Sequence, residues 1–178
     1  MSRIINKLKQ VRWYIWLRDI ALWCAVFFVI SVWQSRNMLD IDSNIVIEKK
    51  LLVGLDGQMS TLLKPDKPTL IYFFAPWCQA CALSIGNLEY LNLDKINIVR
   101  VALDYSNVEQ VQRFAEQHNI SSQILLGHES LKQQFKIRGY PTYYIVDEQF
   151  MNKQHKVLAK SYGYSTALGL KLRQIFSG

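Results

Sequence analysis

Cysteine is scarce in this chain of 178 residues, which contains only Cys24, Cys78 and Cys81. So few cysteines exclude a small scaffold held together by disulfides. A zinc site is disfavoured too, because it needs further ligands, and the chain has no second Cys-x-x-Cys pair and only three scattered histidines. We therefore expect no metal and no cofactor. Cys24 falls in an apolar stretch and is interpreted as a structural residue.

Acidic residues are absent from the first 18 positions, which carry five basic side chains. The formal net charge of the whole chain is +7, but residues 51–178 contribute only thirteen bases against ten acids. The basic character is therefore largely that of the N-terminal tail. The main body has no basic face interleaved with aromatic residues, so we do not expect nucleic acid as a partner.

An apolar segment follows this basic leader. Residues 13–33 would form a helix of about 30 Å, roughly the thickness of the hydrocarbon core of a bilayer, with tryptophans at both ends. Arg18 and Asp19 interrupt the segment near its basic end, where Arg18 can reach the headgroups and Asp19 can pair with it. A buried core helix and a cleaved signal peptide are the alternatives. The first rarely has large apolar residues on every face, and residues 32–35 make a poor cleavage site.

We therefore expect a single transmembrane signal anchor. Positive charge before an anchor predicts a cytoplasmic N-terminus and an extracytoplasmic C-terminal part. The predicted organisation is a cytoplasmic leader (1–12), an anchor (13–33), a tether (34–50) and one folded domain (51–178).

The remaining chain alternates strand-like and helix-like segments, which predicts an α/β domain with a central sheet covered on both faces. Its expected strands are 51–53, 69–75, 96–103, 123–126, 142–146 and 157–164, and its expected helices are 79–91, 104–119, 130–135 and 166–176. The run 69–75 is short, apolar and rich in aromatics, so we interpret it as a buried central strand. In the first expected helix, the residues that we expect to face the core include Leu83, Leu88 and Leu91.

The pair Cys78 and Cys81 stands between that strand and that helix. At a helix start, the first sulfur faces unpaired backbone N–H groups and the positive end of the helix dipole, which favours its thiolate form. A thiolate separated by two residues from a resolving thiol suits disulfide exchange. The pair is thus a candidate redox-active disulfide, with Cys78 attacking and Cys81 resolving.

The surroundings of the pair resemble the thioredoxin superfamily. The strand followed by Trp77-Cys78-Gln79-Ala80-Cys81 is one matching part, and the segment Arg138–Thr142, which contains Tyr140 and Pro141, is the other. With the expected anchor, the chain is most similar to membrane-tethered thiol-disulfide oxidoreductases of the TlpA/ResA type. The resemblance implies a thioredoxin-like fold with a mixed sheet and a cis bond before Pro141. It also implies that Trp77, Tyr140 and Pro141 support the site and contact substrate.

Two positions depart from that pattern. Tyr72 stands where thioredoxins often have a buried acid, and Ser84 stands where the TlpA/ResA type often has a glutamate. Glu89 is eight residues beyond Cys81, too far along a helix for direct contact. Gln79-Ala80 is neither the pair typical of reducing thioredoxins nor a histidine-containing pair, so we expect an intermediate reduction potential.

The cysteine pair predicts the chemistry but not its direction, since a dithiol and its disulfide exchange either way. The resemblance favours reduction of protein disulfides on the periplasmic side of a bacterial cytoplasmic membrane, with a membrane-bound electron donor restoring the dithiol. A disulfide oxidase or isomerase is one alternative. A non-catalytic module that binds a partner or a metal is the other.

Overall fold

A computed structural model describes residues 13–14, 16–26, 28–30, 38–41, 44–45, 51–64, 67–91, 93–149 and 154–163. The chain divides into two compact units, Met1–Asn37 and Met38–Gly178. The expected leader (1–12) and the expected terminal helix (166–176) lie outside the described residues.

The described part of the first unit is helical at residues 13–14, 16–26 and 28–30. The Arg18 guanidinium donates to the Asp19 carboxylate at 3.1 and 3.2 Å, so the predicted pairing is confirmed. Within the residues described, no helix combines the length and the apolar character that crossing a bilayer requires. The anchor over 13–33 stays a prediction.

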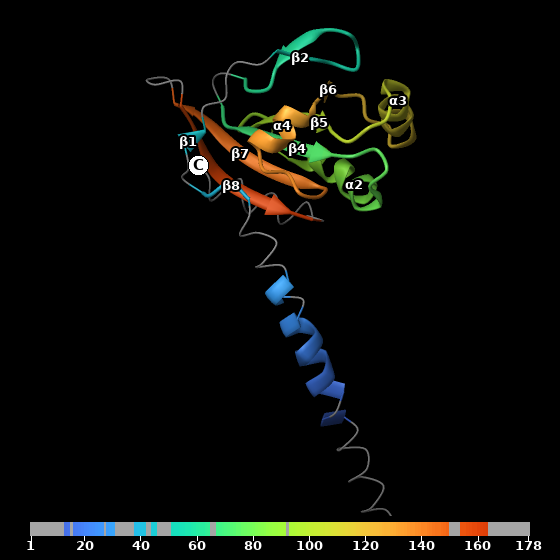
Figure 1. The fold of residues 1–178 in the computed structure, drawn as a ribbon, viewed down its shortest axis with the longest axis vertical. Helices are drawn as coiled ribbons and strands as arrows, with labels where there is room; N and C mark the ends of the chain where they lie inside the picture. The colour runs from blue at the N-terminus through green and yellow to red at the C-terminus, as the bar shows by residue number, and fades with distance from the viewer. Residues whose placement is uncertain are drawn as a thin grey trace, which may run out of the picture. The chain divides into compact units, whose positions relative to one another are not determined.

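The second unit is built on a six-stranded sheet with the strand order β1-β8-β7-β4-β5-β6 (Figure 1). The strands are β1 (Asn44–Ile45), β4 (Thr69–Phe74), β5 (Asn97–Ala102), β6 (Ile124–Leu126), β7 (Thr142–Gln149) and β8 (Gln154–Tyr162). β4, β5 and β6 are parallel, whereas β7 is antiparallel to β4, and β8 is antiparallel to β7 and β1. The expected mixed central sheet is confirmed.

All six residues of β4 are buried, as expected for the central apolar run. Ile71 and Phe73 point to one face, where Phe73 packs on Phe135 with ring centroids 5.0 Å apart. Leu70, Tyr72 and Phe74 point to the other face. Alternation along one strand therefore supplies both hydrophobic cores of the unit.

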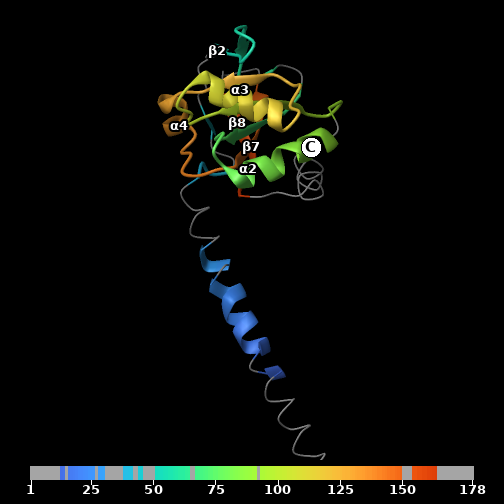
Figure 2. The ribbon, with the colours of Figure 1, turned by 90° about the vertical axis from the view of Figure 1, so that its right-hand side faces the viewer.

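Helices cover both faces of the sheet. α4 (Glu129–Gln134) contributes Leu131 to the core that contains Ile71 and Phe73. α2 (Gln79–Ser84), the 3-10 helix η1 (Ile85–Tyr90) and α3 (Val108–Gln117) contribute to the opposite core. Figure 2 looks from the right-hand side of Figure 1 and shows α2 and α3 in front of the sheet.

Two short strands, β1 and β3, were not expected. The predicted strand β2 (Leu51–Val53) pairs antiparallel with β3 (Met59–Thr61) in a separate two-stranded sheet. The turn between them uses Gly57 at a φ of 77°, a conformation open to glycine. Within the expected tether (34–50), Met38 and Leu39 are buried in a core and β1 pairs with β8.

The helix expected over 79–91 is divided, because α-helical hydrogen bonding ends at Ser84 and 3-10 geometry continues to Tyr90. The tighter winding places Ile85 and Leu88, three residues apart, on the same inward face. Leu88 and Leu91 are buried as predicted. The prediction for Leu83 was wrong, because this side chain is 74% exposed while Cys81 and Ser84 occupy the inward face of α2.

The helix expected over 104–119 begins only at Val108. Asn107 is its N-cap, and its side-chain oxygen accepts from the Gln110 backbone N–H at 2.9 Å. Asparagine is among the preferred N-cap residues because its side chain satisfies a free amide of the first turn.

Two leucines of α2 and η1 offer a stability test. Leu88→Ala should lower the free energy of unfolding by about 2–5 kcal/mol, because Leu88 is 0% exposed and its removal leaves a cavity. Leu83→Ala, the matched control, should change it by less than about 0.5 kcal/mol. Urea denaturation measures both values, and equal losses would contradict the inward orientation of Leu88 and the outward orientation of Leu83.

Candidate active site

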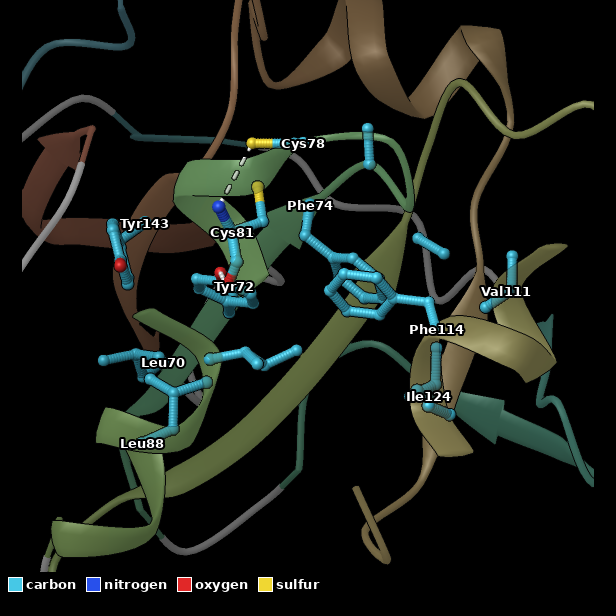
Figure 3. Packing of buried hydrophobic residues seen from close by; sticks show 14 of the residues in the cluster. Leu70, Tyr72, Phe74, Cys78, Cys81, Leu88, Val111, Phe114, Ile124 and Tyr143 are labelled. Atoms are coloured by element: carbon cyan, nitrogen blue, oxygen red, sulfur yellow. Dashed lines mark hydrogen bonds between the residues drawn. The ribbon is translucent and has the colours of Figure 1, made fainter. Parts of the chain in front are cut away.

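The turn after β4 delivers Cys78 to the start of α2. Its backbone N–H donates to the Ala75 carbonyl at 3.0 Å, and Cys78 itself is the extended N-cap residue of the helix. The Cys81 N–H donates to the Cys78 sulfur at 3.2 Å, which Figure 3 marks with a dashed line. A backbone donor aimed at this sulfur favours negative charge on it.

The two cysteines differ in burial. Cys78 is 8% exposed, whereas Cys81 is 0% exposed and lies deeper in the core beside Tyr72. The sulfurs are not bonded to each other in this structure. Burial raises the pKa of the Cys81 thiol, and its hydrogen bond with Cys78 raises that pKa further. The geometry therefore distinguishes an outer thiol from an inner one.

The second predicted segment lies beside the pair. The Tyr140–Pro141 peptide bond is cis, so the predicted isomer is confirmed. Tyr140 packs against the core cluster that contains both cysteines. Gly139, which precedes Tyr140, lies close to the Tyr162 side chain. A Cβ at position 139 would lie 2.3 Å from the Tyr162 hydroxyl.

Trp77 and Tyr140 meet edge to face, with ring centroids 5.8 Å apart and an interplanar angle of 83°. Trp77 is 60% exposed, and its indole N–H donates to the Asp104 carbonyl at 2.8 Å. Asp104 adopts a φ of 49°, and its carboxylate accepts from Lys132 at 2.7 and 3.0 Å. We call Trp77, Tyr140, Asp104 and Lys132 the aromatic wall. Sequence reasoning named only the two aromatic members.

Tyr72 and Ser84, which stand where acidic residues were expected, contact each other under Cys81. The Tyr72 hydroxyl lies 3.0 Å from the Ser84 Oγ and donates to the Cys81 carbonyl at 3.2 Å. The Ser84 hydroxyl donates to the Ala80 carbonyl at 2.8 Å. Sequence reasoning identified both positions but not their contact. The alternation of β4 and the three-residue spacing of Cys81 and Ser84 were the signals that could have found it.

A buried cation lies next to Tyr72. Arg100 is the residue of β5 in register with Tyr72, and its side chain is 4% exposed. Its guanidinium donates to the carboxylate of Glu89, which is itself 60% exposed. Glu89 therefore pairs with Arg100. A single arginine in the otherwise apolar run 98–102 was the signal that sequence reasoning overlooked.

The arrangement suits dithiol–disulfide chemistry. An outer sulfur next to a backbone donor can attack a disulfide, and an inner sulfur three residues away can displace the product. Among the residues that the structure describes, no group of three histidine, cysteine or acidic side chains could hold a metal ion.

Solved structures with the same architecture cover most of the chain. A thiol:disulfide interchange protein of the thioredoxin family from Chlorobium tepidum aligns with a TM-score of 0.61 and 17% identity, over 79% of this chain and 100% of that one. A secreted disulfide oxidoreductase of Mycobacterium tuberculosis, homologous to the DsbE protein of Escherichia coli, aligns with a TM-score of 0.57 and 16% identity. That match covers 71% of this chain and 95% of the other. The fold is therefore thioredoxin-like.

A relative detected by sequence is the thioredoxin-like protein YneN of Bacillus subtilis, which is 30% identical over 106 residues. The match covers 55% of this chain, and the chain spans only 61% of the length of that relative. The model of the AhpC/TSA family matches residues 50–155, a range that includes both cysteines, Tyr72 and the cis-proline segment. The chain thus belongs to the AhpC/TSA family, of which it is a member with a thioredoxin-like fold.

Proposed function

We propose that this protein is a membrane-anchored, extracytoplasmic thiol-disulfide oxidoreductase that reduces disulfides of substrate proteins. The observation that carries the proposal is the paired placement of Cys78 and Cys81, one at the helix start with a backbone donor on its sulfur and the other buried behind it. Catalytic roles for these two residues, and supporting roles for Trp77, Tyr140 and Pro141, are part of the proposal.

The reaction has two exchange steps. The Cys78 thiolate attacks one sulfur of a substrate disulfide, the S–S bond breaks, and the other substrate sulfur leaves with the electron pair and takes up a proton. The Cys81 thiolate then attacks the Cys78 sulfur and releases the second substrate sulfur. The substrate gains two electrons and two protons, and the Cys78–Cys81 pair becomes a disulfide.

The proposed direction needs a reductant. A compartment outside the cytoplasm is oxidising, so a dithiol on a membrane-bound electron donor would exchange with the Cys78–Cys81 disulfide and restore both thiols. The pair Gln79-Ala80 places no charge beside Cys78, which supports a couple that is not strongly oxidising.

The proposed location follows from the N-terminal unit. Its described helical residues expose large apolar side chains, including Trp16, Trp23 and Phe28. Burying such a surface in lipid is favourable, and the five basic residues before position 19 predict a cytoplasmic N-terminus. The likeness of the fold to a secreted disulfide oxidoreductase supports an extracytoplasmic domain.

A non-catalytic binding module is the other candidate, and the replacement of both expected carboxylates by Tyr72 and Ser84 is the observation that favours it. The aromatic wall would then hold a partner without exchange of disulfides. Oxidase or isomerase activity is the alternative direction for the same cysteines.

Serine variants separate exchange from binding. Cys78→Ser should abolish reduction of insulin disulfides, because the attacking sulfur is lost. Cys81→Ser should retain attack but not resolution, so mixed disulfides with substrates should accumulate on Cys78 and appear as mass-shifted species on non-reducing gels. Cys24→Ser is the matched control and should reduce insulin like the parent. A parent protein that exchanges no disulfide would overturn the enzymatic proposal in favour of the binding module.

The reduction potential decides the direction. We expect the Cys78–Cys81 couple to lie between thioredoxin, at about −270 mV, and the strongest dithiol oxidants, at about −120 mV. Equilibration with glutathione buffers, followed by alkylation of free thiols, measures it. A value near the upper end, about −120 mV, would indicate that the protein is a disulfide oxidase and not a reductase.

Topology is tested in intact bacterial cells that express the full chain. Protease added to spheroplasts should degrade the domain over 51–178, because it lies outside the membrane, while a cytoplasmic marker protein stays intact. Neutral substitutions at Arg3, Lys7, Lys9 and Arg12 should reduce the fraction of chains whose N-terminus is protected. Protection of the domain in spheroplasts, with degradation after lysis, would contradict the proposed location.

A further inference from the structure

The aromatic wall joins two loops and a helix at one end of the sheet. Trp77 follows β4 by three residues, and Asp104 follows β5 by two. β4 and β5 are parallel neighbours, so both loops leave the sheet at the same end. Lys132 comes from α4, which covers the sheet face opposite to α2. The bonds from Trp77 to Asp104 and from Asp104 to Lys132 therefore connect the turn before α2 to a helix on the other face.

Trp77 offers apolar surface to a partner. Its only polar side-chain group, the indole N–H, donates to the Asp104 carbonyl at 2.8 Å, while the residue is 60% exposed. The ring also meets Tyr140 edge to face. A ring whose N–H is already bonded binds a partner through apolar contact. Because Trp77 directly precedes Cys78, its surface suits an apolar residue next to a substrate disulfide.

The backbone at Asp104 adopts a conformation that glycine would take more easily. Its φ of 49° lies in the left-handed region, which is unfavourable for most residues with a side chain. The group that glycine would lack is the carboxylate, which accepts from the Lys132 Nζ at 2.7 and 3.0 Å. The carbonyl of the same residue accepts from Trp77. Holding the carboxylate therefore restricts the carbonyl that orients the indole.

Lys132 stands on a firmly packed support. Leu131 beside it and Phe135 at the end of α4 are both 0% exposed. The side chains of Lys132 and Asp104 are 26% and 31% exposed, so both charges are partly withdrawn from water. Glu129 is 3.9 Å from the Lys132 ammonium, a longer contact than that to Asp104. Asp104 is thus the main partner of Lys132.

We propose that Lys132 is a positioning residue: through Asp104 it holds Trp77 so that the exposed indole binds an apolar residue beside the substrate disulfide. The inference rests on the proposed oxidoreductase function and adds to it a preference among substrates. Lys132 acts through two other residues, so its loss should weaken the binding of apolar substrates and leave the exchange between sulfurs unchanged.

Two peptide disulfides test this preference with the reduced full chain in detergent micelles. Both are homodimers of the same length, with leucine on each side of the cysteine in one and serine in the other. Single-turnover release of the peptide thiol, measured over a range of peptide concentrations, gives a maximal rate and a half-saturating concentration. Every protein also carries Cys24→Ser, which removes the third thiol. The parent should half-saturate at a lower concentration of the leucine peptide.

Lys132→Met should raise the half-saturating concentration of the leucine peptide about two- to fivefold. This corresponds to about 0.4–1 kcal/mol, the range of partly exposed ion pairs. The maximal rate and both values for the serine peptide should stay within about 1.5-fold, because neither depends on the indole. Lys132→Arg, which keeps the charge, should restore the parental value. Lys136→Met is the matched control, since it removes an exposed charge four residues away, and it should match the parent.

Asp104→Gly breaks the same contact from the other side. Glycine suits the φ of this position and removes the carboxylate, so the leucine peptide should again bind about two- to fivefold more weakly. The double variant should be no weaker than either single variant, because both lose one shared interaction. The two substitutions change the net charge in opposite directions. Simple attraction between protein and peptide would therefore shift the two variants in opposite directions.

A spectroscopic signature shows whether the indole has moved. In the full chain labelled with 5-fluorotryptophan, Trp77→Phe assigns one fluorine signal to Trp77. Lys132→Met should shift or broaden that signal and leave the other tryptophan signals unchanged, whereas Lys136→Met should change none of them.

The outcomes separate the two proposals. If the parent reduces neither peptide, the oxidoreductase function fails. If the parent reduces both but Lys132→Met binds the leucine peptide like the parent, only the role of Lys132 fails. Opposite shifts for Lys132→Met and Asp104→Gly, or equal binding of both peptides by the parent, would also overturn the inference.

Discussion

The burial of β4 on both faces is the constraint on which this structure depends. Its six residues occupy the middle of the mixed sheet between β5 and β7, and alternate side chains fill two separate cores. The register that places Phe73 on one face necessarily places Tyr72 on the other, under α2. β4 ends four residues before Cys78. The same strand therefore positions both the turn that carries Cys78 and the Tyr72 hydroxyl below Cys81.

Several features followed from local patterns in the sequence. The apolar run of β4 and the cysteine pair at the helix start have short-range signatures, and the structure has both. The cis bond before Pro141 is also present, but its prediction came from the family resemblance, since an X-Pro bond taken alone is usually trans. The exposure of Leu83 did not follow, because helical spacing alone did not reveal that 3-10 winding begins at Ile85. β1 and β3 are only two and three residues long. Strands this short do not show a recognisable alternation of apolar and polar residues in the sequence.

The polar contacts of the core were the least predictable part. Tyr72 and Ser84 are twelve residues apart, and Arg100 and Glu89 are eleven apart, so each contact exists only once helix and sheet are packed. The replacement of the expected carboxylates by Tyr72 and Ser84 was visible in the sequence, but the contact between these two side chains was not. A phenol differs from a carboxylate in holding a proton across the physiological range.

The hydrogen bonds that hold the aromatic wall in place do not involve Cys78 or Cys81. Trp77 is bonded to the Asp104 carbonyl, and the Asp104 carboxylate is bonded to Lys132 on α4. Neither sulfur takes part in these bonds. Trp77 and Lys132 are therefore both fixed to Asp104, a residue outside the Cys78–Cys81 turn, so the exposed indole is held in place by a loop of the sheet and not by the thiols beside it.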